Sequence, residues 1–157
     1  MLKKILTILP IILLLSCQSN AQKNNTDVKI QKTDIQWKNE LSSIEYYVLR
    51  ESGTERAFTG TYNKFYKDGL YHCNGCDTPL FKSKHKFDSG TGWPSFDTAI
   101  KENVSYDSDI NIGYTRTEIH CTTCGGHLGH VFNDGPKETT GKRYCVNSVS
   151  LIFYPTE

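Results

Sequence analysis

The chain has 157 residues, with 18 lysines and arginines against 17 aspartates and glutamates, and 37% of its residues are hydrophobic. This length suits one domain with an N-terminal extension. Residues 1–16 carry Lys3, Lys4 and no acidic residue, so removing them leaves 16 basic and 17 acidic residues and a formal charge of −1. Nucleic-acid binding normally needs a basic surface, so this composition argues against a nucleic-acid partner.

The first 36 residues have the pattern of an export signal followed by a tether. Residues 5–15 are apolar apart from Thr7 and Pro10, and they are too few to span a bilayer as a helix. Residues 14–17 (Leu-Leu-Ser-Cys) resemble the bacterial lipobox, in which the cysteine, here Cys17, is lipidated. An ordinary signal peptide cleaved near Ala21 is the alternative.

We therefore predict a lipoprotein-type signal peptide over residues 1–16. Residues 17–36 are predicted to be a lipid-anchor cysteine followed by a flexible polar tether. The protein would be exported to the cell envelope, as a periplasm-facing lipoprotein or a secreted protein. It would touch a membrane only through the anchor.

Residues 37–157 are predicted to form one folded domain. Ser42 and Glu45 have capping-box spacing, which predicts a helix over residues 43–50 that ends near Gly53. Residues 57–71 predict short strands and a hairpin, and residues 110–120 and 142–154 alternate as strands do. The pattern indicates a mainly β, mostly antiparallel fold with one or two short N-terminal helices.

Two Cys-x-x-Cys pairs, Cys73 with Cys76 and Cys121 with Cys124, are separated by 44 residues. Four thiolates suit tetrahedral zinc, and a site with all four positions filled is structural rather than catalytic. The ion would pin two distant hairpins together. Redox or structural disulfides are the alternative, and iron suits the same ligands.

A glycine-rich stretch after the second pair holds His127 and His130. Because four cysteines complete the metal site, these imidazoles are free for proton transfer, although one could instead ligate the metal. Trp93 lies in a loop with Gly92 and Pro94, and it is equally suited to the core or to a ligand platform.

Residues 143–154 are rich in β-branched and aromatic residues, which predicts one buried strand. Side chains alternate along a strand, so Arg143, Cys145 and Asn147 would share a face, followed by Val149, Leu151 and Phe153. A neighbouring cation lowers a cysteine pKa, which favours a reactive Cys145. The alternative is that Cys145 is a small core residue.

Four stretches together resemble the B-type methionine sulfoxide reductases: GTERAFTG at 53–60, FDSGTGWPSF at 87–96, GHLGHVFNDGP at 126–136 and RYCVNSVSL at 143–151. Both Cys-x-x-Cys pairs match as well, so the resemblance covers roughly residues 37–154. It implies two antiparallel sheets in a compact barrel-like or sandwich domain. It also implies structural zinc far from the active site.

The resemblance implies a role for each matching residue. Cys145 would be the nucleophile that attacks the sulfoxide sulfur and becomes a sulfenic acid. His127 and His130 would protonate the departing oxygen, while Arg143 and Asn147 would order the site. Two aromatic residues, Trp93 and Phe132, would bind the substrate.

One departure matters, because many family members have a resolving cysteine where this chain has Thr91. We therefore expect a one-cysteine cycle, in which an external thioredoxin-like donor reduces the sulfenic acid of a monomeric enzyme. The substrate would be methionine-R-sulfoxide in peptides and exported proteins, which the enzyme repairs. The rivals are a zinc-dependent binding module without catalysis and a zinc-supported enzyme acting on other thiol or carbonyl compounds.

Overall fold

The structure is a computed structural model that describes residues 28–110 and 113–156. Two short helices come first, α1 (Asp34–Glu40) and α2 (Ser43–Glu51), and each begins with a capping box. The predicted start of α2 is confirmed, whereas its C-cap is Ser52, in the left-handed conformation at φ 54°, rather than Gly53. A Cβ at Gly53 would lie 2.3 Å from the half-exposed Tyr47 ring, so that ring would have to move to accept a side chain there.

Helix α1 begins inside the stretch predicted to be tether and continues into the predicted domain. Thr33 caps it, Trp37 on it is 1% exposed, and the Ile30 amide donates to the Thr123 carbonyl at 2.9 Å. The folded part of the chain therefore begins before residue 37. The predicted signal peptide, Cys17 and the first part of the tether lie outside the described residues. No helix within the described ranges is both long and apolar enough to cross a membrane.

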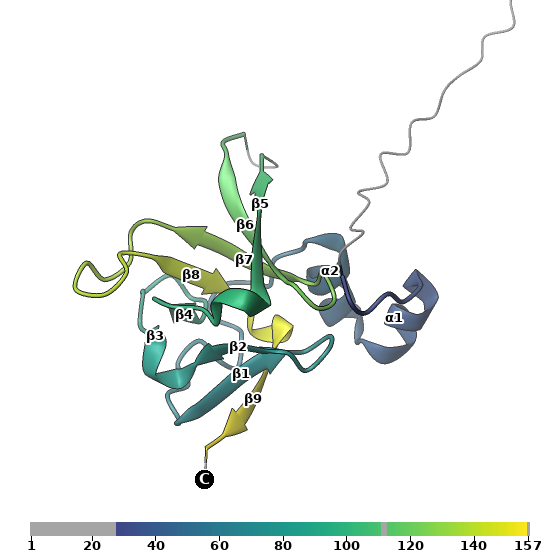
Figure 1. Cartoon of the computed structure of the whole chain (residues 1–157), viewed down its shortest axis with the longest axis horizontal. Coiled ribbons are helices and arrows are strands. Elements are labelled where there is room, and N and C mark those ends of the chain that lie inside the picture. The colour runs from purple at the N-terminus through teal and green to yellow at the C-terminus, as the bar shows by residue number, and fades with distance from the viewer. Residues whose placement is uncertain (1–27, 111–112, 157) are drawn as a thin grey trace, which may run out of the picture.

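Within residues 28–110 and 113–156, nine strands form two antiparallel sheets (Figure 1). The small sheet has the order β2-β1-β9, from β1 (Gly69–Cys73), β2 (Pro79–Lys82) and β9 (Leu151–Pro155). The large sheet has the order β3-β4-β8-β7-β6-β5. Its strands are β3 (Lys86–Phe87), β4 (Ser95–Phe96), β5 (Val104–Asp109), β6 (Arg116–Cys121), β7 (His127–Phe132) and β8 (Arg143–Val146). The predicted mainly β fold of two antiparallel sheets is confirmed. In the part of the chain that is described, however, the sheets do not close into a barrel.

The described part of the chain also contains three 3-10 turns: η1 (Ser83–His85), η2 (Lys101–Asn103) and η3 (Ser148–Ser150). The core lies between the sheets. Phe81 on β2 stacks on Phe96 of β4 with ring centroids 4.4 Å apart, and Tyr71 of β1 meets Phe96 edge-on at 5.0 Å. These rings are fully buried, so the two sheets share one apolar interior.

Two strand predictions are wrong in part. Residues 57–68 form turns, because their amides bond to loops rather than to a neighbouring strand: Phe58 donates to the Gly92 carbonyl at 2.8 Å and Tyr62 to Ser148 Oγ at 3.1 Å. The run 143–154 is not one strand either. It leaves the large sheet after Val146, turns through η3 and enters the small sheet as β9.

Candidate active site

A cavity of about 120 Å³ opens where β7 and β8 lie side by side. It brings together five residues that the sequence singled out: Trp93, His130, Phe132, Cys145 and Asn147. The remaining lining residues are Thr54, Arg116, Gly129 and Val146. The cavity thus combines one thiol, one imidazole, one amide and two aromatic rings.

Cys145 lies on β8, directly opposite His130 of β7 in the sheet register. Burial raises the pKa of the Cys145 thiol above its usual value. The positive charge of Arg143 and the polar side chain of Thr91 offset only part of that rise. The sequence argument therefore has the right sign for Arg143, but burial outweighs it.

Arg143 is held in a fixed orientation beside Cys145. Its Nε and its terminal nitrogen each donate to a different oxygen of Asp134, both at 2.8 Å, and the guanidinium lies 4.4 Å from the centre of the Phe132 ring. This two-point pair lowers the pKa of Asp134 and keeps the cation near the sulfur. Arg143 and Cys145 do share a face of β8, as alternation predicts, because they lie within the strand proper.

His130 is paired with a buried carboxylate. Its Nε2 lies 2.7 Å from Asp109 Oδ2, and Arg116 forms an ion pair with the same oxygen. Burial lowers the pKa of His130 below its usual value, although the Asp109 hydrogen bond opposes this shift. The imidazole is therefore neutral at pH 7, with Nε2–H donating to Asp109.

His127 does not line the cavity. Its Nδ1 donates to Glu118 Oε1 at 2.6 Å, and the same oxygen accepts from His120 Nε2 at 2.9 Å and Ser52 Oγ at 3.1 Å. Burial opposes ionisation of Glu118, but the two histidines outweigh it and lower the pKa of that carboxyl. His127 therefore ties β7 to β6 and α2, while His130 alone of the two faces the cavity.

Asn147 is fixed by two buried backbone groups. Its side-chain oxygen accepts from the Glu55 amide at 3.0 Å, and its side-chain nitrogen donates to the Leu128 carbonyl at 3.1 Å. These partners permit one orientation of the amide. Asn147 therefore presents a constant surface to the cavity.

Glu55 is a site residue that the sequence reasoning missed. Its carboxylate accepts from the amides of Ser148 at 2.6 Å and Val149 at 3.1 Å, and its carbonyl accepts from Trp93 Nε1 at 3.1 Å. Burial raises the pKa of Glu55, against these two amide bonds. One residue thus positions both the tryptophan and the turn that follows Cys145. Its presence in the 53–60 motif was the only available signal.

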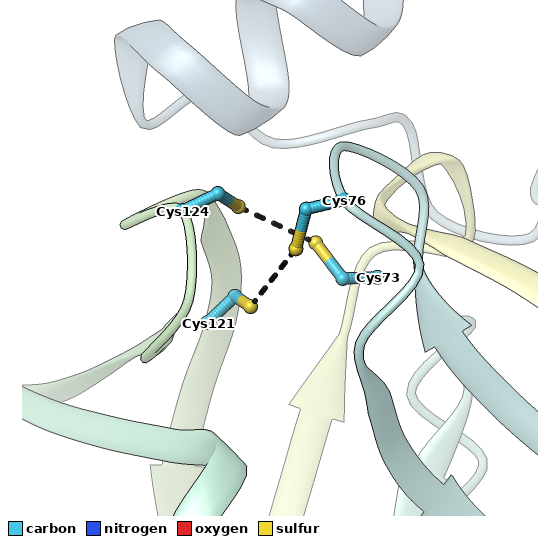
Figure 2. A group of neighbouring side chains, drawn as sticks. All are labelled: Cys73, Cys76, Cys121 and Cys124. Carbon is cyan, nitrogen blue, oxygen red and sulfur yellow. Dashed lines mark hydrogen bonds between the residues drawn. The ribbon is translucent and has the colours of Figure 1, made fainter. Parts of the chain in front are cut away.

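The four cysteines of the two pairs form a second cluster (Figure 2). Their sulfurs all lie within 4.8 Å of one another, with Cys73 and Cys124 at 3.7 Å and Cys76 and Cys121 at 3.5 Å. Zn–S bonds of about 2.3 Å in a tetrahedron place sulfurs about 3.8 Å apart, whereas a disulfide needs about 2.05 Å. The thiols therefore fit a metal ion rather than two disulfides, and the cluster joins the β1–β2 turn to the β6–β7 turn.

Comparison with known proteins identifies the family. The SelR domain matches residues 41–155. The peptide methionine sulfoxide reductase MsrB of Chromohalobacter salexigens is 50% identical over 130 residues, which is 82% of this chain and 98% of that protein. The protein of the same name from Thiobacillus denitrificans is 54% identical over 127 residues, or 80% of this chain and 96% of that protein. The chain belongs to the SelR family. The resemblance to B-type methionine sulfoxide reductases is thereby confirmed.

A solved structure, the Mis18 'Yippee-like' domain, aligns with a TM-score of 0.45 at 17% identity, over 58% of this chain and 99% of that one. This similarity is too low to carry an argument.

The cavity and the cysteine cluster are separate sites, since none of the four clustered cysteines lines the cavity. Thr91, where the family resemblance implies a resolving cysteine in many members, carries a hydroxyl and not a thiol. The described residues therefore offer no second thiol at the cavity.

Proposed function

We propose that this protein reduces methionine-R-sulfoxide in peptides and proteins to methionine, with Cys145 as the nucleophile. The observation that carries this proposal is one cavity that holds a thiol between Trp93, Phe132 and a carboxylate-paired imidazole. A methyl sulfoxide has an apolar methyl group and a basic oxygen. The two rings suit the methyl group, and the polar wall suits the oxygen.

Proton transfer falls to His130. The neutral ring, with Nε2–H donating to Asp109, can accept the Cys145 proton on Nδ1. The thiolate then attacks the sulfoxide sulfur, and the imidazolium, stabilised by Asp109, protonates the oxygen. The balance is Cys145–SH + R₂SO → Cys145–SOH + R₂S, in which the cysteine sulfur loses the two electrons that the methionine sulfur gains. His127 has a positioning role, since Glu118 holds it away from the cavity.

Regeneration requires an external donor, because Thr91 replaces a resolving thiol and the four clustered cysteines suit a metal. A dithiol such as a thioredoxin-like protein would reduce the sulfenic acid: Cys145–SOH + R(SH)₂ → Cys145–SH + RS₂ + H₂O. We further propose that the metal is structural zinc, since four thiolates leave no open position for substrate.

The lipobox-like residues 14–17 support a further proposal, that the domain is exported and anchored through Cys17. There it would repair oxidised proteins of the cell envelope. A binding module without catalysis is less well supported, because it leaves the thiol, imidazole and aromatic rings of the cavity without a role.

The test is turnover of the separated R and S diastereomers of a methionine sulfoxide peptide, with dithiothreitol as donor. We expect reduction of the R form only, and none by Cys145→Ser with an unchanged metal content and melting temperature. Turnover by Cys145→Ser, or preference for the S form, would contradict the proposal. Without donor, one equivalent of substrate should leave Cys145 reactive to dimedone, and an intramolecular disulfide at Cys145 would exclude the one-cysteine cycle.

A further inference from the structure

Phe58 is a bulky residue in a strained and exposed position. Its φ is 67°, in the left-handed region that aromatic residues rarely adopt, and 66% of its surface is exposed. The backbone conformation costs free energy, and a ring that stays in water recovers little of it through burial. Strain of this kind gathers at ligand-binding sites, so Phe58 calls for a role beyond folding.

The Phe58 ring is fixed beside the wall of the cavity. The Phe58 amide donates to the Gly92 carbonyl at 2.8 Å. A Cβ on Gly92 would lie 2.8 Å from the Phe58 nitrogen and 2.9 Å from its ring atom Cδ2, so the ring edge lies over the Gly92 backbone. The next residue, Trp93, lines the cavity, and its indole donates to the Glu55 carbonyl at 3.1 Å. These two bonds hold the segment that carries Phe58 against the segment that carries Trp93.

Phe58 also lines a second hollow, of about 390 Å³. The other residues that line this hollow are Gly60, Thr61, Asn63 and Lys64. The Tyr62 amide donates to Ser148 Oγ at 3.1 Å, which anchors the loop on the turn that follows Cys145. Lys64 in the hollow and Arg56, two residues before Phe58, are both exposed cations, so the surface favours a neutral or acidic ligand over a basic one.

We propose that Phe58 and this hollow bind the residues that flank methionine sulfoxide in a peptide substrate, with an apolar side chain of the peptide on the Phe58 ring. The cavity at Cys145 measures about 120 Å³, so the rest of a peptide has to lie across its rim. An extended chain advances about 3.3–3.6 Å per residue, so a peptide residue one or two positions from the sulfoxide can reach a ring that contacts Gly92. This inference rests on the proposed function and names the part of the substrate that lies outside the cavity.

The test compares two pentapeptides with methionine-R-sulfoxide in the middle and blocked ends, one with leucines and one with glycines as the flanking residues. The metal-loaded full chain reduces each with dithiothreitol as donor, and the measured quantity is the ratio of the two kcat/KM values. Covering about 50 Å² of an apolar ring corresponds to roughly eightfold in affinity, so the ratio should fall about eightfold in Phe58→Gly, through KM more than kcat. An effect on the Trp93 loop would act on both peptides and cancel in the ratio.

The variants are chosen to keep the backbone in place. Glycine adopts positive φ without strain and keeps the amide that donates to Gly92, and Phe58→Asn is a second variant without the ring, since asparagine also tolerates the left-handed region. Phe58→Leu keeps an apolar side chain and should retain most of the ratio. Ile35→Ala is the matched control, because it removes an apolar side chain that is 72% exposed on α1, and it should leave the ratio at the wild-type value.

A wild-type ratio in Phe58→Gly, or an equal fall in Ile35→Ala, would overturn the proposal, and Phe58→Asn decides in the same way if Phe58→Gly does not fold. A wild-type ratio with slower turnover only when a thioredoxin replaces dithiothreitol would place the donor on Phe58 and overturn it too. If neither peptide is reduced, the proposed function fails, and calorimetric binding of the same peptides decides the inference. Weaker binding of the leucine peptide alone in Phe58→Gly would then support it, and equal binding would overturn it.

Discussion

Replacing Asn147 by aspartate should destabilise the protein in a pH-dependent way. In the wild type the side-chain oxygen of Asn147 accepts from the Glu55 amide and its nitrogen donates to the Leu128 carbonyl. Asn147→Asp is nearly isosteric and keeps the first bond. Its second oxygen would face the Leu128 carbonyl about where the nitrogen stood, so two acceptors meet in a buried site unless the new carboxyl holds a proton.

The size of the loss in the free energy of unfolding depends on whether the new carboxyl is protonated. The native pKa of the new carboxyl would rise above its unfolded value of about 3.9. Below the unfolded value both states are protonated and the variant retains its bonds. Between the two pKa values the loss of stability grows by about 1.4 kcal/mol per pH unit, and above the native pKa it levels off.

Asn147→Ala is the matched control. It orphans the Glu55 amide but not the Leu128 carbonyl, which also accepts from the Asn147 backbone amide at 2.9 Å. Its loss should be about 1–3 kcal/mol and should not depend on this titration. Urea unfolding of both variants from pH 5.5 to 8, with metal bound, gives the difference. A difference between the two variants that is flat with pH would refute the assigned orientation of the amide.

Three further predictions concern the strands around Cys145, the cluster and the proton balance. Gly129→Ala places a Cβ 2.1 Å from the Cys145 carbonyl oxygen at φ +150°, whereas Gly141→Ala at φ +68° meets nothing within 4 Å. Urea unfolding should show that Gly129→Ala lowers the free energy of unfolding by more than about 3 kcal/mol and Gly141→Ala by about 1–2 kcal/mol. Equal losses in the two variants would contradict the close approach at Gly129. Chelation should release about one zinc ion per chain and abolish cooperative unfolding until zinc is restored; an unchanged urea curve would contradict a structural metal. The single-turnover rate should not change with pH near neutrality. It should fall below pH 6.5, because burial lowers the pKa of His130, and above pH 9, because burial raises the pKa of Cys145. A change of rate between pH 7 and 8.5 would contradict a proton shared between His130 and Cys145.

Local spacing predicted the features that need only neighbours in sequence. The cysteine pairs and the Ser42–Glu45 capping box are examples, since a few residues fix both. The same spacing in Thr33 and Gln36 starts α1, but the surrounding polar composition indicated tether instead. The packing of Trp37 against the core makes that helix part of the fold.

Long-range partners decided what local patterns could not. Residues 143–154 alternate without interruption, yet the strand ends at Val146 because the carboxylate of Glu55, more than ninety positions earlier, takes the next two free amides. Buried carboxylates are rare enough that composition favours an exposed Glu55 and an exposed Glu118. His127 is held away from the cavity by Glu118, whereas His130 lines it. The motif therefore predicted that both histidines lie near the site, but not that only His130 faces the cavity.

The crossover between the sheets has a consequence for local opening. All four amides of residues 147–150 are engaged although none belongs to a strand: Asn147 donates to the Leu128 carbonyl, Ser148 and Val149 to Glu55, and Ser150 to the Asn147 carbonyl. A connection between two sheets usually exchanges its amide hydrogens quickly, because water reaches it. Here slow exchange should run without a gap from β8 into β9. The segment that follows Cys145 is therefore as protected as the strands on either side of it, and we expect the two sheets to unfold locally together rather than one at a time.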